Sequence, residues 1–305
     1  MQQTSCKNQS VTGVFSLAAA FLIWGVAPIY WKQLGDIPAF EIILHRIIWS
    51  FFLLIPVMTG YRLWPEYRQV LKSGRKMVVL AGTTVVLAFN WFVFVWAINN
   101  DQVLQTSLGY YINPLVNVLL GMVFLKEQLN RRQGLAVFLA TVGVLILTFY
   151  YGRFPWISLT LAFSFGFYGL IRKIVPVSAI TGLFIELSLL AVPAGAWLVY
   201  LYRTESGAFL RTGMTMDLFC LGASLVTALP LIFFTTGTRL VHLKTVGFMQ
   251  YIAPSCTFLL AVFVFHEPLS TVFLLTFVLI WTALAIYSYD SVQSWRHSTD
   301  SDRTA

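Results

Sequence analysis

The stretch VLQTSLGYYINPLVNVLLGMVFL, residues 103–125, runs without a single charged side chain. An α-helix needs about 20 consecutive, mostly apolar residues to cross the hydrocarbon core of a bilayer. A second uncharged stretch, GFMQYIAPSCTFLLAVFVF at residues 247–265, repeats the Tyr-Ile-x-Pro pattern of the first. Both stretches therefore predict membrane-spanning helices.

The composition extends this prediction to the whole chain. Of its 305 residues, 58% are hydrophobic and 10% are charged, and the mean hydropathy is +0.77. Soluble domains carry about 25% charged residues, so this composition excludes an ordinary soluble protein. The hydrophobic residues suffice for about nine spans, and for more when Gly, Ser, Thr and Pro are admitted to the helices.

Apolar runs between polar breaks predict ten spanning helices. They are expected at residues 13–33, 40–60, 76–98, 103–125, 133–151, 155–172, 179–201, 217–238, 244–265 and 270–289. Short tails remain at residues 1–12 and 290–305. The first run is expected to stay as a span, because Lys7 is a weak basic flank and no cleavage pattern follows the run.

The basic residues predict the orientation, because cytoplasmic loops of membrane proteins are enriched in Lys and Arg. If the N-terminus is cytoplasmic and the spans alternate, fifteen of the 20 basic residues fall inside, Arg172 and Lys173 among them, and four fall outside. Arg46 lies within a span. This distribution predicts cytoplasmic N- and C-termini in a bacterial inner membrane. It also explains the net charge of +8 without a nucleic-acid partner.

The two halves of the sequence share an internal repeat. Tyr111 and Pro114 recur as Tyr251 and Pro254 at an offset of 140 residues, and Glu41 recurs as Glu186 at an offset of 145. The repeats are expected at residues 13–151 and 155–289. Each has five helices, an odd number, so the second repeat enters the membrane from the opposite side. Inverted repeats that enclose a midplane site are the architecture of many secondary transporters.

Several motifs resemble a known family. They are Trp24-Gly25 with Pro28, HRIIWS at residues 45–50, WAINN at 96–100, SLGYYINPLVNVLLG at 107–121, AFSFGFYGLIRK at 162–173 and GFMQYIAP at 247–254. They look like the RarD proteins, a branch of the EamA group in the drug/metabolite transporter superfamily. The resemblance implies an all-α membrane protein with ten transmembrane helices, arranged as two inverted five-helix repeats around a central cavity. It also implies export of small organic metabolites, amino acids or drugs such as chloramphenicol.

Three ionisable residues in the second span, Glu41, His45 and Arg46, are candidates for a coupling or charge site. Glu41 and His45 are four residues apart and share a helix face. In one interpretation Glu41 is a solvated carboxylate at a helix N-terminus and Arg46 is structural. In the other, Glu41 or His45 takes up a coupling proton and Arg46 attracts an anionic group of the substrate.

Glu186 lies well inside the seventh span and has no basic residue three or four positions away. It must therefore find a partner on another helix, face water or be neutral. Acids inside spans are candidates for proton relays, although an interfacial position explains Glu186 equally well. Glu127 and Glu267 follow spans four and nine and are expected to cap the next helix.

Aromatic and neutral polar side chains near mid-bilayer are candidates for the substrate site, because this mixture suits a pocket for small organic molecules. The candidates are Tyr111, Asn113, Gln250, Asn90, Trp24, Trp91, Tyr168 and Phe163. Asn113 and Asn117 share a helix face. The alternative is that the amides only join helices.

Sequence motifs of enzymes and pumps are absent from the chain. It contains no GxSxG elbow and no Walker A loop, and His266-Glu267 lacks the second His of an HExxH site. We therefore expect no catalytic residue, no cofactor and no metal. The preferred hypothesis is a secondary transporter whose partners are a small molecule, the lipid bilayer and a coupling proton. The alternative is a membrane enzyme or a structural membrane protein.

Overall fold

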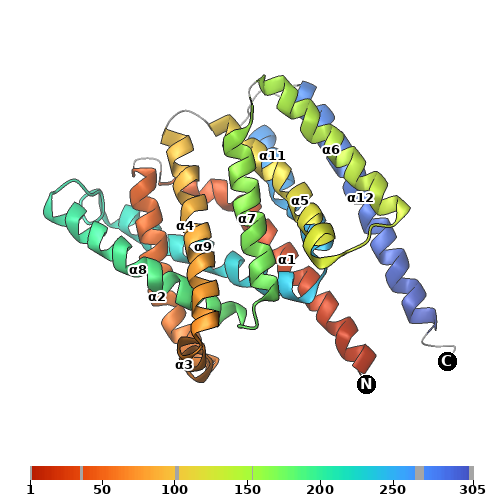
Figure 1. The fold of residues 1–305 in the computed structure, drawn as a ribbon. Coiled ribbons are helices and arrows are strands. Elements are labelled where there is room, and N and C mark those ends of the chain that lie inside the picture. Colours follow the sequence, from red (N-terminus) through yellow and green to blue (C-terminus); the bar gives the residue numbers. More distant parts are fainter. Residues whose placement is uncertain (1, 35–36, 100–102, 153, 265–270, 302–305) are drawn as a thin grey trace.

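The structure is a computed structural model that describes residues 2–34, 37–99, 103–152, 154–264 and 271–301. In these ranges the regular secondary structure is entirely helical (Figure 1). The helices are α1 (Gln2–Lys32), α2 (Ala39–Gly60), α3 (Trp64–Lys72), α4 (Gly74–Asn99), α5 (Val103–Leu125), α6 (Arg131–Tyr151), α7 (Trp156–Ile174), α8 (Ala179–Arg203), α9 (Met214–Leu240), α10 (Leu243–Gln250), α11 (Ile252–Phe263) and α12 (Thr271–Ser301).

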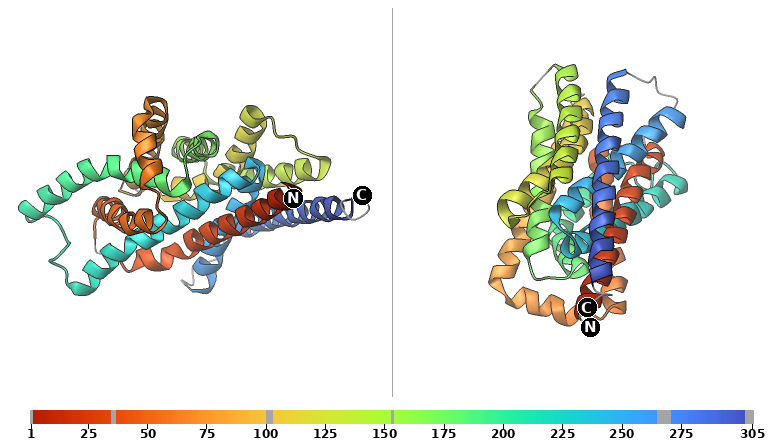
Figure 2. Two further views of the ribbon diagram at one scale, coloured as in Figure 1. Left: turned by 90° about the horizontal axis from the view of Figure 1, so that it is seen from below. Right: turned by 90° about the vertical axis from the view of Figure 1, so that its right-hand side faces the viewer.

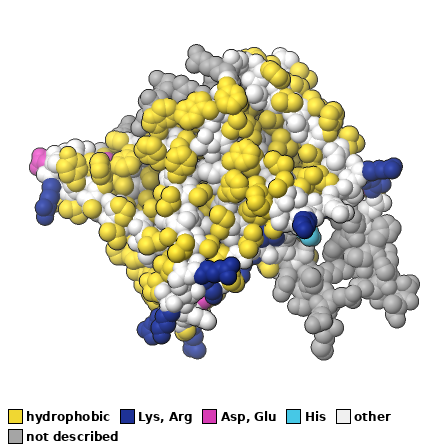
Figure 3. All heavy atoms as spheres, viewed as in Figure 1, with side chains coloured by type: hydrophobic (Ala, Val, Ile, Leu, Met, Phe, Trp, Pro, Cys, Tyr) yellow, Lys and Arg dark blue, Asp and Glu magenta, His cyan; other side chains and the backbone are white. Residues whose placement is uncertain are grey.

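Eight of the described helices contain a segment long and apolar enough to cross a membrane. These helices are α1, α2, α4, α5, α6, α7, α8 and α9. The apolar part of α12, Leu274–Asp290, is shorter. Hydrophobic side chains cover most of the molecular face in Figure 3, and Lys and Arg lie toward its edges. The protein is therefore an all-helical, multi-pass membrane protein.

The helix expected at residues 244–265 is divided at Tyr251 into α10 and α11. Pro254 explains the position of the break. Proline has no backbone N–H, so the carbonyl of Gln250, four residues earlier, loses its helical partner. The backbone is interrupted directly after Gln250, so a single continuous helix was the wrong prediction here.

The short helix α3 was not expected. Its nine residues are too few to span a bilayer, and the sequence between two predicted spans is easily taken for a loop. Pro65 lies in the first turn, where its missing N–H costs nothing. Trp64 and Tyr67 pack their rings against Phe184 of α8, with centroid separations of 5.6 and 5.4 Å.

Helices from the two sequence halves pack mainly against one another. Helix α1 packs on α9 and α11, α2 on α8 and α9, α5 on α7 and α10, and α6 on α12. The last pair forms the right-hand edge of Figure 1. The start of α1 and the end of α12 lie on the same side of the molecule (Figure 2).

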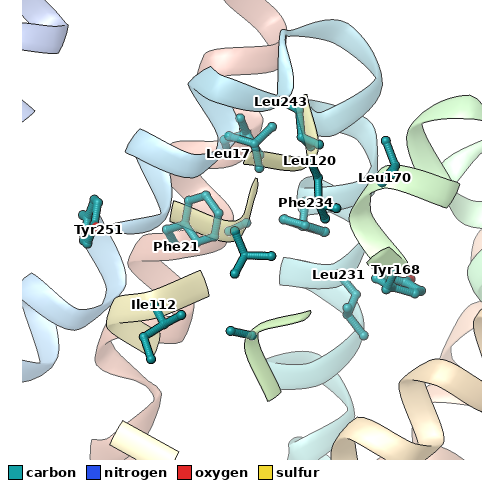
Figure 4. Close-up of a cluster of buried hydrophobic side chains, with 14 of the residues drawn as sticks. Leu17, Phe21, Ile112, Leu120, Tyr168, Leu170, Leu231, Phe234, Leu243 and Tyr251 are labelled. Carbon is teal, nitrogen blue, oxygen red and sulfur yellow. The ribbon is translucent and has the colours of Figure 1, made fainter. Parts of the chain in front are cut away.

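Aromatic rings fill the centre of the molecule. Phe234 of α9 is fully buried and lies within 6.0 Å of Phe21, 5.7 Å of Trp24 and 5.0 Å of Phe165, measured between ring centroids. Figure 4 shows this core, to which α1, α5, α7, α9 and α10 all contribute side chains. Trp24, a candidate for the substrate site, is thus a partly buried member of the aromatic core.

Glycine permits the closest approach of α1 to α11. A Cβ atom on Gly25 would lie 2.6 Å from Cys256 Cβ and 3.1 Å from the carbonyl oxygen of Ala253. Neither atom belongs to a flexible side-chain end, so the two helices would have to separate. The small residue at position 25 therefore sets the distance between these helices.

We predict that Gly25→Ala lowers the free energy of unfolding by about 1–3 kcal/mol, the usual cost of overpacking. Gly82→Ala is the matched control, because a Cβ at Gly82 would meet nothing within 4 Å. Thermal unfolding of the purified variants in detergent measures both effects. Equal stability of the two variants would show that α1 and α11 are not in tight contact.

Candidate functional site

Arg46 lies in the middle of α2 and is surrounded by aromatic rings. Its guanidinium carbon is 5.0 Å from the ring centroid of Trp31 in α1 and 5.3 Å from that of Trp91 in α4. Its Nε donates a hydrogen bond of 2.8 Å to Thr227 Oγ1 in α9. Helices from both sequence halves therefore hold this one cation.

Among the described residues, no carboxylate pairs with the charge of Arg46. Ring faces attract a guanidinium, but they do not neutralise it. Tyr110 of α5 keeps 51% of its surface exposed. The site thus combines an uncompensated cation with aromatic walls.

An amide cluster, which we define as Asn113, Asn117 and Gln250, joins α5 to the end of α10. Asn117 Nδ2 donates to Gln250 Oε1 at 2.6 Å and to Asn113 Oδ1 at 3.3 Å. All three residues are buried. Asn117 Oδ1 is buried and accepts no hydrogen bond from the described residues, which is rare for a buried oxygen. Asn113 and Gln250, both candidates from the sequence, are thus brought together by Asn117.

Tyr111 lies beside the break between α10 and α11. It is buried, and its backbone carbonyl accepts a 3.3 Å hydrogen bond from the hydroxyl of Tyr251. Its ring packs edge-on against Phe277 of α12, with the centroids 5.6 Å apart. The two repeat-related tyrosines therefore meet at the boundary between the sequence halves.

Two other candidates for the substrate site make contacts of a different kind. Asn90 Nδ2 donates to the carbonyl of Leu161 at 3.0 Å and to Ser164 Oγ at 2.9 Å, so it ties α4 to α7. Phe163 is partly buried and packs on Phe167, with the ring centroids 6.4 Å apart. The contacts of Asn90 therefore fit the alternative interpretation, in which the amides only join helices.

Glu41 binds the loop between α8 and α9. Its carboxylate accepts hydrogen bonds from the backbone N–H of Ala208 at 2.8 and 3.0 Å and from that of Phe209 at 3.1 Å. His45 Nε2 lies 3.7 Å from Glu41 Oε1, and His45 Nδ1 accepts a 3.0 Å hydrogen bond from Trp49 Nε1. Glu41 is only 3% exposed, so it is a buried bridge to the second half and not a solvated helix end.

Glu186 finds its partners on two other helices. Thr83 Oγ1 of α4 donates to Glu186 Oε1 at 2.6 Å, and the hydroxyl of Tyr168 in α7 donates to Oε2 at 3.1 Å. Arg172 Nε, also from α7, lies 3.8 Å from Oε1. These four residues, which we call the Glu186 cluster, include Tyr168, a substrate-site candidate that instead contacts this carboxylate.

Arg172, the last residue of the span expected at 155–172 and one of the cations counted as cytoplasmic, is buried in the structure. Its side chain is 0% exposed, and its Nη2 donates to the carbonyls of Ser178 and Ala179, both at 3.2 Å. The neighbour Lys173 made the pair look like a loop charge. The spacing of the two residues provides no clear signal for this contact, because Arg172 lies at the end of α7 and Glu186 lies further from the turn, along α8.

Two acidic residues bind the N-terminal ends of distant helices. Glu66 of α3 accepts from the backbone N–H of Ser178 at 2.7 Å and from Thr181 Oγ1 at 2.6 Å. Burial alone would raise the pKa of Glu66, but the hydrogen bonds from Ser178 and Thr181 lower it below its ordinary value. Glu127 accepts from the backbone N–H groups of Leu243 and Lys244 at 2.7 and 2.9 Å.

Glu127 therefore caps α10, and the expectation that it caps the next helix was wrong. Helix α6 is instead capped by Asn130, whose side chain accepts from the backbone N–H of Gln133. The repeat-related Glu267 and its neighbour His266 lie outside the described residues.

The fold and these contacts define a class. Long apolar helices enclose polar side chains that bond across the two sequence halves, as in a multi-pass membrane protein with a functional interior.

Comparison with known proteins identifies the family. Residues 11–149 match the EamA-like transporter family. The chain is 43% identical to a Salmonella typhi protein described as Protein RarD, across 95% of this chain and 98% of the relative. It is 42% identical to a Vibrio cholerae protein described as an uncharacterized transporter, across 96% and 97%. The chain belongs to the EamA-like transporter family, among the RarD proteins, and is a bacterial membrane transporter.

A solved structure supports the fold. A protein of known crystal structure, only 15% identical, superposes with a TM-score of 0.69 over 94% of this chain and 98% of that chain. At this identity the likeness concerns the arrangement of the helices alone.

We predict strong energetic coupling between Arg172 and Glu186. Arg172→Met and Glu186→Leu should each lower the free energy of unfolding by about 3–5 kcal/mol, because each leaves a buried charge unpaired. The double variant should lose much less than the sum, as measured by unfolding in detergent.

Lys173→Met serves as the control in this cycle, because Lys173 Nζ donates to the carbonyl of Thr238 and not to Glu186. The loss of unfolding free energy caused by Lys173→Met should add to the loss caused by Glu186→Leu. Additive losses for Arg172→Met and Glu186→Leu would show that the two charges do not stabilise each other.

Proposed function

We propose that the protein exports a small organic substrate by alternating access between two inverted five-helix halves, residues 13–151 and 155–289. The ten predicted spans and the repeat of Tyr111 and Pro114 at Tyr251 and Pro254 support this architecture. The single observation that carries the proposal is the uncompensated charge of Arg46, held by helices of both halves.

Arg46 selects the chemistry of the substrate in this proposal. A cation without a carboxylate partner inside a membrane protein favours an anionic group, such as the carboxylate of an amino acid. Trp31 and Trp91 supply aromatic faces for the apolar part of the substrate. Asn113 and Gln250 supply neutral hydrogen-bonding groups from the amide cluster, where Asn117 Oδ1 is an unused acceptor.

In this proposal, contacts between the two halves act as the gates that close the ends of the substrate pathway. Glu41 of the first half holds the backbone of Ala208 and Phe209 in the second half. Glu66 of the first half holds Ser178 and Thr181 at the start of α8. Alternating access requires that contacts at one end of the molecule open while those at the other end stay closed.

Proton coupling is assigned to Glu186 in preference to Glu41 and His45. Protonation of Glu186 would leave the charge of Arg172 buried without a counter-charge, which is costly in a low dielectric. Thr83, which also bonds Glu186, belongs to the first half, so protonation weakens a contact between the halves. Protonation of Glu41 would affect a loop instead.

The proposed orientation places both chain ends in the cytoplasm, with the protein in the inner membrane. The excess of basic residues on that side supports it, as does the location of the start of α1 and the end of α12 on one side of the molecule (Figure 2).

We predict that Arg46→Gln reduces transport of carboxylate substrates about tenfold to hundredfold, the value of a charge-assisted hydrogen bond. Uptake into inverted vesicles is measured with matched pairs of acids and their neutral amides. The variant should reduce transport of the neutral amides less than transport of the acids. Equal transport of both members of each pair by wild type and variant would refute a role for Arg46 in substrate recognition.

A pH gradient should drive uptake by the wild type but not by Glu186→Gln, because the amide cannot exchange a proton. The amide keeps one oxygen that accepts from Thr83 or from Tyr168, and the melting temperature of the variant in detergent checks that it folds. Glu41→Gln is the comparison, and it should retain the response to the gradient. Gradient-driven uptake by Glu186→Gln at the wild-type level would exclude this residue from coupling.

A further inference from the structure

Residues 61–76, YRLWPEYRQVLKSGRK, connect α2 to α4 and contain α3. The segment carries a single acidic residue, Glu66, among five cations, Arg62, Arg68, Lys72, Arg75 and Lys76. Enrichment in cations is expected of a loop that stays in the cytoplasm. The rule does not say where the side chains point, and the fold separates the acidic residue of this segment from its cations.

One face of α3 is fixed to the body of the protein. Trp64 and Tyr67 pack on Phe184, and Val70 is 1% exposed in a cluster with Leu80 and residues of the α7–α8 turn. Trp64 Nε1 also donates a 3.0 Å hydrogen bond to Thr59 Oγ1 at the end of α2. Helix α3 is therefore fixed in place by this docking, and its opposite face points away from the body of the protein.

Glu66 points toward the body and not toward the cations. Its two carboxylate oxygens are occupied by the backbone N–H and hydroxyl of Ser178 and by the hydroxyl of Thr181. The negative charge is thus used in capping α8, where the helix dipole favours it. It forms no ion pair with a cation of residues 61–76.

The cations occupy the outer side. Arg62, Arg68, Lys72 and Arg75 are all exposed, and no ion pair among the described residues includes any of them. We call these four residues the α3 basic face. Basic side chains gather at the lower end of the molecule in Figure 3, where Figure 1 places α3.

Helix α3 adjoins the ends of two spanning helices. It lies between Gly60, the last residue of α2, and Gly74, the first of α4. The apolar residues Tyr61, Leu71 and Val78 are exposed by 71%, 45% and 72%, as expected where a protein meets lipid. The cations are therefore held at the level of the lipid head groups.

We propose that the α3 basic face binds the phosphates of anionic phospholipid head groups in the adjoining leaflet. Arg68 and Lys72 on the docked helix, with Arg62 just before it and Arg75 in the first turn of α4, meet a surface of opposite charge within a Debye length. Arg and Lys donate several hydrogen bonds to phosphate oxygens, whereas a zwitterionic head group offers no net charge. The proposal rests on the membrane-spanning architecture and is independent of the transported substrate.

Binding of lipid is tested with the purified full-length chain. Dioctanoyl phosphatidylglycerol or dioctanoyl phosphatidylcholine is titrated into the detergent-solubilised protein, and native mass spectrometry measures the bound lipid. We expect preferential binding of phosphatidylglycerol. Arg68→Gln/Lys72→Gln should weaken it about tenfold, because each cation near an anionic surface contributes a several-fold factor. Phosphatidylglycerol should also raise the melting temperature of the wild type more than that of the variant.

Lys126→Gln/Arg131→Gln is the matched control, because both residues are exposed and their removal changes the net charge equally. This control should bind phosphatidylglycerol within about twofold of the wild type. Melting in phosphatidylcholine checks that all variants fold.

Three results would overturn the proposal. The first is unchanged lipid binding by a folded Arg68→Gln/Lys72→Gln. The second is an equal loss in the control, which would indicate unspecific charge attraction. The third is an equal rise in melting temperature with inorganic phosphate alone, which would indicate a site for a free anion.

Discussion

A charged side chain in the hydrocarbon interior must find a partner or a wet cavity, and this requirement organises the polar interior of the protein. Glu186 is satisfied by Thr83, Tyr168 and Arg172, and Glu41 by the backbone of Ala208 and Phe209. In both cases the partners include groups from the other sequence half. Satisfying the charges therefore also joins the halves, so the cost of burying an acid is offset by contacts that define the tertiary structure.

The repeat gives this arrangement a further consequence. Glu41 and Glu186 are matched positions in the proposed repeat, and each bonds to the opposite sequence half. The partners differ in kind. Glu41 binds backbone N–H groups of a loop, whereas Glu186 faces the cation of Arg172. A loop contact is relieved by a local movement, whereas separating a buried ion pair costs several kcal/mol. The two matched positions of the proposed repeat thus make contacts of different strength, and this asymmetry fits the proposed alternating access, in which the two ends open under different conditions.

Hydrophobic length was enough to predict most of the helices, because about 20 apolar residues leave the chain little choice in a bilayer. The features that sequence reasoning missed are short or depend on tertiary contacts. Helix α3 is amphipathic and only nine residues long, so its docking on Phe184 determines its place. Arg172 next to Lys173 was counted among the cytoplasmic cations, and its contact with Glu186 is seen only in the structure. The candidate site residues were predicted only in part, for the same reason. Asn113 and Gln250 do converge, but the residue that links them, Asn117, is identified only by the hydrogen bonds.

Arg46 and Arg172 show why burial alone does not mark a functional charge. Arg172 is fully buried, with a carboxylate and two carbonyls within reach, although its Nε and Nη1 donate no hydrogen bond to the described residues. Among the described residues, the partly buried Arg46 has one hydroxyl and two ring faces. A structural role favours the fullest satisfaction of a buried cation, because each missing partner lowers stability. A binding role favours the opposite, since a guanidinium already neutralised by a carboxylate has little attraction left for a ligand. The environment of Arg46, which offers no carboxylate among the described residues, is thus suited to the recognition role proposed for it, whereas the ion pair of Arg172 with Glu186 suits a structural role.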